Sequence, residues 1–502
     1  MEGLSQLIDA LQGMMNPITL FHVFWATLLG ISIGILPGLT ATLALTLMTT
    51  LTLRMNPESA ILVLICIYVG TIYGGSRTAI LLNIPGTPAS AATTLDGFPL
   101  AQAGMAGKAM GIATSGSVLG TIIGMIGLAI FAPALGELAL GFQSYEFFWL
   151  ALFGVVISGR LTALEDPIKG WLAGFIGLLI AMVGQESLTG YSRFSYNSAE
   201  LTGGFALLPV MVGIFGLAEI LVVMKTPMYR VAKSTSDSVI PKIRDVVRYW
   251  RTILRSGLTG TFTGLVPGVG EDMGAWVSYA LTRNASKEKE KFGKGSVEGL
   301  MAAEAGNSAA VPGSIIPVLT LAVPGSAPAA VLLAALYIHG VQPGPMIMEH
   351  SPHFVFNIVA MIFLASIAIL VLGLLLTKPM IYILRVPRDR LMPVIVVLCT
   401  VGSFAVASRV FDIYIMLIFG VIGFILREMK YPMAPLILGV VLGPILDENL
   451  RRSLNLSDGD LTPFFTRPIS LILCLAIVLT IALGSKPVAN FLKRQKAVQK
   501  TE

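Results

Sequence analysis

Charge is scarce in this sequence. Only 12% of its 502 residues are Asp, Glu, Lys or Arg, whereas a soluble domain carries about 25%. The hydrophobic share is 55% and the mean hydropathy is +0.81. These values argue against a soluble globular enzyme with a large core. Because long apolar segments recur along the whole chain, the sequence predicts an all-α polytopic membrane protein.

Cysteine and histidine are also rare. The three cysteines lie far apart in apolar segments and show no disulfide framework or metal-ligand spacing: Cys66, Cys399 and Cys474. The four histidines do not form a ligand spacing on one helix: His22, His339, His350 and His353. We expect no metal site and no cofactor. The sequence also lacks an HExxH pair and a G-x-S-x-G motif, which argues against an intramembrane enzyme.

Basic residues gather in loops between the apolar segments. This placement indicates membrane topology rather than nucleic-acid binding, so the bilayer is an expected partner and nucleic acid is not. Four apolar segments are short for a bilayer core and are expected to tilt or to span only part of it: 145–159, 391–407, 410–426 and 432–446. The predicted domains are an interfacial N-terminal helix (1–18), a first membrane repeat (19–224), a cytoplasmic basic linker (225–255), a second membrane repeat with C-terminal helices (256–485) and a cytoplasmic tail (486–502).

Proline and glycine stand side by side inside four apolar segments. Pro37-Gly38 recurs 230 residues later as Pro267-Gly268, and Pro85-Gly86 recurs 239 residues later as Pro324-Gly325. Proline inside a helix destabilises that helix by about 3 kcal/mol. A helix that only crosses the membrane would therefore have no reason to contain these pairs. We predict two inverted-topology repeats, each with a re-entrant hairpin and a Pro-Gly-broken helix. The alternative is that each pair is only a packing kink.

Broken helices expose backbone N–H groups and positive dipole ends, which suit an anion. Polar residues and Pro-Gly pairs near the breaks are therefore candidates for substrate binding: Ser76, Asn83, Pro85, Gly86, Thr87, Thr93, Thr94, Asn307, Ser308, Pro324, Gly325 and Ser326. Capping and helix packing are the alternative roles for their hydroxyls. Four acids are candidates for coupling to a cation, Na⁺ or H⁺: Asp96, Glu271, Asp272 and Glu304. Glu271 and Asp272 have capping of a new helix as their alternative.

Three long stretches resemble the large membrane subunit of the tripartite tricarboxylate transporters. They are "YGGSRTAILLNIPGTPASAATTLDGFPLAQAG" (73–104), "GTFTGLVPGVGEDMGAW" (260–276) and "EGLMAAEAGNSAAVPGSIIPVLTLAVPGSAPAAVLLAAL" (298–336). The resemblance covers most of residues 20–350. One departure is Arg77, where the family pattern leads us to expect a small or apolar residue. Arg77 is a further candidate for substrate binding, with snorkelling or pairing to an acid such as Asp96 as the alternative.

The resemblance implies a secondary active importer of tricarboxylate or related carboxylate anions, driven by a sodium or proton gradient. It also implies two partners, a small membrane subunit and a periplasmic substrate-binding protein, and a place in the bacterial inner membrane. A passive anion channel and a structural membrane subunit without a site of its own stay open as alternatives.

Overall fold

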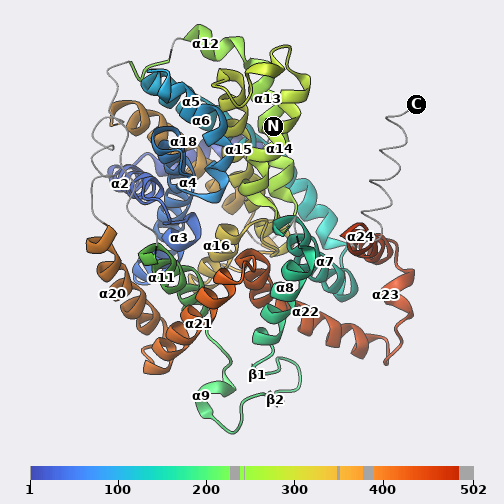
Figure 1. Ribbon diagram of the computed structural model, residues 1–502. Coiled ribbons are helices and arrows are strands. Elements are labelled where there is room, and N and C mark those ends of the chain that lie inside the picture. The colour runs from blue at the N-terminus through green and yellow to red at the C-terminus, as the bar shows by residue number, and fades with distance from the viewer. Residues whose placement is uncertain are drawn as a thin grey trace. The chain divides into compact units, whose positions relative to one another are not determined.

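The computed structural model describes residues 2–163, 166–225, 238–241, 243–347, 351–376 and 388–484. Helices make up most of this part of the chain (Figure 1). The α-helices are α1 (Glu2–Met14), α2 (Pro17–Ile35), α3 (Ala41–Thr52), α4 (Pro57–Leu82), α5 (Ala91–Gln102), α6 (Ala106–Leu140), α7 (Ser144–Thr162), α8 (Pro167–Ala181), α9 (Ala199–Thr202), α10 (Leu207–Met211), α11 (Ala218–Lys225), α12 (Ile243–Arg248), α13 (Trp250–Leu265), α14 (Gly270–Ala285), α15 (Val297–Leu321), α16 (Ala327–Ile338), α18 (Pro352–Leu375), α20 (Arg388–Ala407), α21 (Val410–Glu428), α22 (Met433–Leu456), α23 (Thr462–Thr466) and α24 (Pro468–Gly484). The remaining elements are η1 (Pro88–Ser90), the π-helix η2 (Val212–Leu217), η3 (Lys289–Lys291) and the antiparallel strands β1 (Gly184–Gln185) and β2 (Ser192–Arg193).

Nine helices of the described chain are long and apolar enough to cross a membrane, counting α10, η2 and α11 as one. The others are α2, α4, α6, α7, α18, α20, α21 and α22. The outer ones expose large apolar side chains, as a lipid environment requires: Val394 on α20 and Ile418 on α21 are both more than half exposed. The predicted all-α polytopic membrane fold is confirmed.

One expectation about helix length is wrong. The apolar segments at 145–159, 391–407, 410–426 and 432–446 belong to α7, α20, α21 and α22, which have 19, 20, 19 and 24 residues. The helices continue into flanking polar residues that a hydropathy reading leaves out. Each is therefore long enough to cross a bilayer core of about 30 Å.

The chain forms two compact units. Unit 1 combines Met1–Leu140 with Leu208–Phe424, and unit 2 combines Gly141–Leu207 with Ile425–Glu502. In unit 1, α4 and α15 are buried along almost their whole length, with α2 packed on α4 and with α6, α13 and α14 packed on α15 (Figure 1). Helices that are apolar all round belong in such a core.

The four Pro-Gly pairs of the sequence repeat each lie at a helix break, whereas Pro312-Gly313 lies inside α15. The breaks separate α2 from α3, α4 from η1, α13 from α14, and α15 from α16. The break between α4 and η1 and the break between α15 and α16 share one backbone geometry. Asn83 and Ala322 have left-handed φ values of 58° and 54° where α4 and α15 end. Beyond them, the Gly86 N–H donates to the Gly75 carbonyl at 3.3 Å, and the Gly325 N–H donates to the Ser314 carbonyl at 3.4 Å.

The packing around the two breaks also repeats. A Cβ atom on Gly86 would lie 2.3 Å from the Gly34 carbonyl oxygen, and one on Gly325 would lie 2.2 Å from that of Gly264. Gly34 and Gly264 are equivalent in the 230-residue repeat. The sequence repeat therefore corresponds to a repeated local structure. The inverted orientation of the two copies and their re-entrant insertion stay predictions.

Several predicted regions lie partly or wholly outside the described residues. These are residues 226–237 and 242 of the predicted linker, His350 and the tail at 486–502. The predicted N-terminal helix exists as α1, and its interfacial position stays a prediction. The division into consecutive domains also stays a prediction.

Candidate functional site

Glu304 is the centre of a buried polar cluster in unit 1. Its side chain, on α15, has no exposed surface. Ser76 Oγ on α4 and Ser117 Oγ on α6 donate to its Oε2 at 2.7 and 2.8 Å, and Thr93 Oγ1 on α5 donates to its Oε1. Four helices thus converge on one carboxylate. Hydrogen bonds to a charged group are strong, about 1.5–3 kcal/mol each, so this cluster holds the four helices together.

Arg77, next to Ser76 in the chain, carries the positive charge nearby. Its guanidinium lies 4.6 Å from the centre of the Tyr73 ring, and its Nη2 donates to Thr114 Oγ1 at 2.8 Å and to the Gly373 carbonyl at 3.3 Å. The side chain is 2% exposed, and its Nε and Nη1 have no hydrogen-bond partner in the part of the chain that the structure describes. Arg77 interacts electrostatically with Glu304, so the two buried charges offset each other. Asp96, the pairing acid suggested by the sequence, is not among its partners.

Glu271 is the centre of a second cluster. Tyr68 Oη on α4 donates to Glu271 Oε2 at 3.0 Å, and lies 3.1 Å from Ser314 Oγ and 2.8 Å from Ser326 Oγ. All four side chains are buried. Glu271 is in the first turn of α14, as the capping alternative requires, but its carboxylate bonds the Tyr68 hydroxyl. The neighbouring Asp272 is exposed.

Asn307 lies on α15 between the two clusters. It is one turn from Glu304 and two turns from Ser314, so the three residues share one face of the helix. Its side chain is fully buried, and neither its Oδ1 nor its Nδ2 has a hydrogen-bond partner among the described residues. An unsatisfied buried amide costs about 1–3 kcal/mol per group, so this one calls for an explanation such as a ligand.

Asp96 has a different environment from the other three acids. Its Oδ1 accepts backbone N–H groups of Gly293, Gly295 and Ser296 at 2.8, 2.9 and 2.8 Å. Its Oδ2 accepts the Tyr279 hydroxyl at 2.9 Å. Asp96 therefore ties α5 to the loop that precedes α15. Its part in ion coupling stays a prediction.

The other predicted residues lie at the breaks or beside them. Asn83 is exposed, Pro85 is half-buried, and Thr94 Oγ1 donates to the Ala91 carbonyl of its own helix at 2.7 Å. The buried ones are Pro37, Gly86, Thr87, Pro267, Gly268, Ser308, Pro324, Gly325 and Ser326, and Gly38 is half-buried. Substrate contact by any of them stays a prediction.

Sequence reasoning missed four polar residues of this region: Tyr68, Tyr73, Thr114 and Ser117. Each lies in an apolar helix far from any Pro-Gly pair in sequence. The repeat carries a signal for one of them, since Tyr68 is the equivalent of Asn307 at the 239-residue offset.

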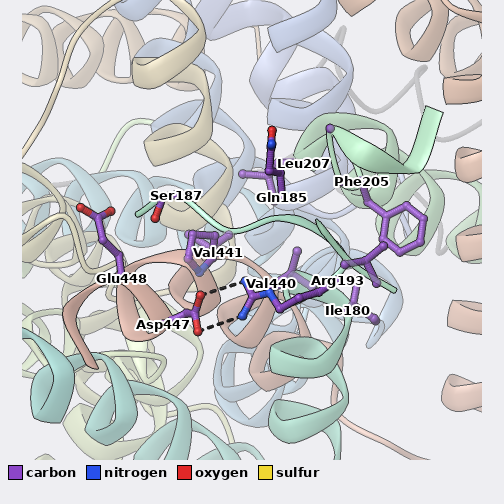
Figure 2. Close-up of a pocket in the computed structure, with 15 residues that line it drawn as sticks. Ile180, Gln185, Ser187, Arg193, Phe205, Leu207, Val440, Val441, Asp447 and Glu448 are labelled. Atoms are coloured by element: carbon purple, nitrogen blue, oxygen red, sulfur yellow. Dashed lines mark hydrogen bonds and ion pairs between the residues drawn. The ribbon is translucent and has the colours of Figure 1, made fainter. Parts of the chain in front are cut away.

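Unit 2 contains a separate cavity of about 280 Å³, beside the loop that carries β1 and β2. Arg193 and Asp447 face each other across its wall through two hydrogen bonds of 3.0 and 2.8 Å (Figure 2). Asp447 also accepts Arg451 Nε at 3.0 Å, and Arg451 lies 3.7 Å from Glu186. The Thr189 hydroxyl donates to Glu186 and, with Arg451, holds the pKa of this carboxyl below its usual 4.5. These ion pairs fix the loop to α22.

Comparisons with known proteins point to one family. The model of the tripartite tricarboxylate transporter TctA family matches residues 20–438. A protein of Agrobacterium vitis, described as an uncharacterized 52.8 kDa protein in the TAR-I ttuC' 3' region, is 34% identical over 97% of this chain and 98% of its own length. A second, described as an uncharacterized protein in the TAR-II ttuC' 3' region of Agrobacterium vitis, is 35% identical over 42% of this chain and 87% of its own length. No solved structure matches.

Proposed function

Since the chain belongs to the tripartite tricarboxylate transporter TctA family, we propose that it is the membrane subunit that imports tricarboxylate or related carboxylate anions by secondary active transport. A cation gradient, of Na⁺ or H⁺, drives the import. The chain works with a small membrane subunit and receives its substrate from a periplasmic binding protein. It lies in the bacterial inner membrane, and it is a carrier rather than an enzyme.

The unsatisfied amide of Asn307 is the observation that carries this proposal. A buried amide without partners in the core of a membrane protein is costly unless a ligand satisfies it. Its Nδ2 can donate to a substrate carboxylate. Arg77 has two buried nitrogen atoms, Nε and Nη1, without partners among the described residues and is a second donor for an anion.

The helix breaks support the same proposal. Non-helical backbone at membrane depth is tolerated where it is buried in protein or lines a cavity. Broken helices in two corresponding halves are typical of secondary transporters, which bind substrate between the repeats. The breaks at Pro85-Gly86 and Pro324-Gly325 both lie in unit 1 with Asn307. Glu271, Asp272, Glu304 and Asp96 are the candidate residues for coupling.

Uptake by reconstituted protein tests the proposal. Liposomes would contain this chain with its small membrane subunit, and labelled citrate would be followed with the binding protein and an inward sodium or proton gradient. We expect Asn307→Ala to abolish uptake, and Asn284→Ala to keep it, because Asn284 is exposed on α14. Equal uptake by both variants would remove Asn307 from the site.

The same assay separates the alternative functions. Flux that continues without any gradient and saturates poorly would indicate a passive anion channel. No uptake of citrate, dicarboxylates or aromatic acids under either gradient would favour a structural subunit.

A further inference from the structure

The two equivalent helix breaks share a backbone but differ in side chains. In the repeat, Tyr68 is equivalent to Asn307, Gly75 to Ser314, Thr87 to Ser326, and Ala41 to Glu271. The matching backbone hydrogen bonds at 3.3 and 3.4 Å show that Gly75 and Ser314 are equivalent in structure as well. The cluster at the second break thus contains a carboxylate (Glu271) and the hydroxyls of Tyr68, Ser314 and Ser326. The equivalent positions in the repeat are Ala41, Asn307, Gly75 and Thr87, which supply one amide and one hydroxyl. The position around Glu271 and the position around Asn307 therefore suit ligands of different charge.

Glu271 differs from the other buried acids of unit 1 in its surroundings. It has no ion-pair partner among the described Lys, Arg and His side chains, and the charged group that acts on it is the acidic Asp272. Glu304 has Arg77 nearby, and Asp96 accepts three backbone N–H groups. A buried carboxylate without a counter-charge is strongly unfavourable unless a cation or a proton neutralises it.

The oxygens around Glu271 form a suitable set of cation ligands. Tyr68 Oη lies within 3.1 Å of oxygens from Glu271, Ser314 and Ser326. One carboxylate among neutral oxygens gives a neutral site with a monovalent cation, and hard cations take oxygen ligands. A further oxygen lies next to Ser314 in the chain, because Pro317 has no N–H to donate to the Gly313 carbonyl.

We propose that Tyr68, Glu271, Ser314 and Ser326 form a binding site for Na⁺. This inference rests on the proposed function and assigns its coupling cation to one of the four candidate acids. The ligands come from α4, α14, α15 and the break before α16. Bound Na⁺ therefore holds the second break against α4, a helix of the first half. That contact is how cation occupancy reaches the neighbouring anion position at Asn307.

Equilibrium binding of ²²Na⁺ tests this site without any transported substrate. The full chain would be purified with its small membrane subunit, and binding measured by scintillation proximity in sodium-free buffer with choline as the replacement cation. We expect saturable Na⁺ binding by the wild type. Glu271→Gln should weaken it by about tenfold or more, because the site then has no charge to balance the cation.

Two further variants make the result specific. Tyr68→Phe removes one oxygen and keeps the carboxylate and the ring, so we expect weaker Na⁺ binding in a protein with a normal elution profile. Glu298→Gln is the matched control, because Glu298, on α15, is likewise a carboxylate that accepts hydroxyls, from Thr252 and Ser286 at 2.8 and 2.7 Å, but is only half-buried. We expect this control to bind Na⁺ like the wild type.

The outcomes separate this site from the proposed function. A wild type that binds no Na⁺, or a Glu271→Gln variant that binds it unchanged, overturns the site even where carboxylate uptake works. A protein that binds Na⁺ through Glu271 but takes up no carboxylate supports the site and contradicts the proposed function.

Discussion

Ser76 donates a hydrogen bond of 2.7 Å to Glu304, which lies 228 residues further along the chain. The bond joins α4 to α15, two long helices of unit 1 that are buried along almost their whole length. The two halves of the repeat differ at this point, since the equivalents of Ser76 and Glu304 are the apolar Ile315 and Ile65. The contribution of this contact to the stability of the protein can be measured with a variant of Glu304.

Replacing Glu304 by Gln should destabilise the protein strongly. The variant loses the charge that three hydroxyls bond and leaves Arg77 buried without its counter-charge, a change that costs about 3–5 kcal/mol. Thermal unfolding in detergent, followed by the loss of the monodisperse elution peak, measures the effect. Glu298→Gln is again the control, and equal unfolding temperatures would show that the Glu304 cluster contributes little.

Gly86→Ala and Gly325→Ala should each destabilise unit 1, and by similar amounts. The added Cβ of Gly86→Ala or Gly325→Ala would lie 2.3 or 2.2 Å from a backbone oxygen, so the backbone must shift, at about 1–3 kcal/mol. Gly203→Ala is the control, because Gly203 has a φ of −76° and open space around it. A tolerated alanine at only one break would show that the two breaks are packed differently.

Asp96→Asn should loosen the loop that precedes α15. The amide keeps one acceptor oxygen but loses the charge that strengthens three backbone hydrogen bonds, so we expect at least about tenfold faster amide exchange at Gly293, Gly295 and Ser296. Hydrogen–deuterium exchange with peptide mass analysis measures this. Glu290→Gln changes an exposed acid of the same loop and should leave the exchange as it is. Unchanged exchange in Asp96→Asn would mean that Asp96 does not hold the loop.

Acid should release the loop that carries β1 and β2. The pKa of Glu186 is lowered when the loop is docked, so the docked state gains stability above the ordinary pKa of 4.5 and loses it as pH falls through the lower value. A nitroxide at Tyr196→Cys, an 85% exposed position, reports loop mobility by electron paramagnetic resonance in a Cys474→Ala background.

We expect that mobility to rise as pH falls from 6 to below 4 when Glu186 is present. In Glu186→Gln we expect a smaller pH response, because no carboxylate titrates at that position and the Arg193–Asp447 pair still ties the loop to α22. A pH response of the same size in both proteins would assign the change to another acid of the loop.

The sequence by itself determined the class of fold, and the Pro-Gly pairs that recur in both halves indicated four of the helix breaks. Apolar segments of sufficient length leave a membrane helix as the only way to satisfy the backbone, and proline removes a donor wherever it stands. Both effects are local, so Pro85-Gly86 and Pro324-Gly325 could be predicted as breaks before their surroundings were known. The recurrence of these pairs also revealed the repeat, because equivalent close approaches demand glycine at equivalent positions.

Tertiary structure alone decided which polar residues meet. Nothing near Tyr68 in the sequence indicates that its hydroxyl reaches Glu271, 203 residues away, and Glu304 collects hydroxyls from three other helices. Asp96, Glu271 and Glu304 look alike as intramembrane acids in sequence. Yet Asp96 bonds backbone N–H groups, Glu304 has Arg77 nearby, and Glu271 has no ion-pair partner among the described basic side chains. The environment of a buried charge depends on its neighbours in space, and helix packing rather than chain order sets those neighbours.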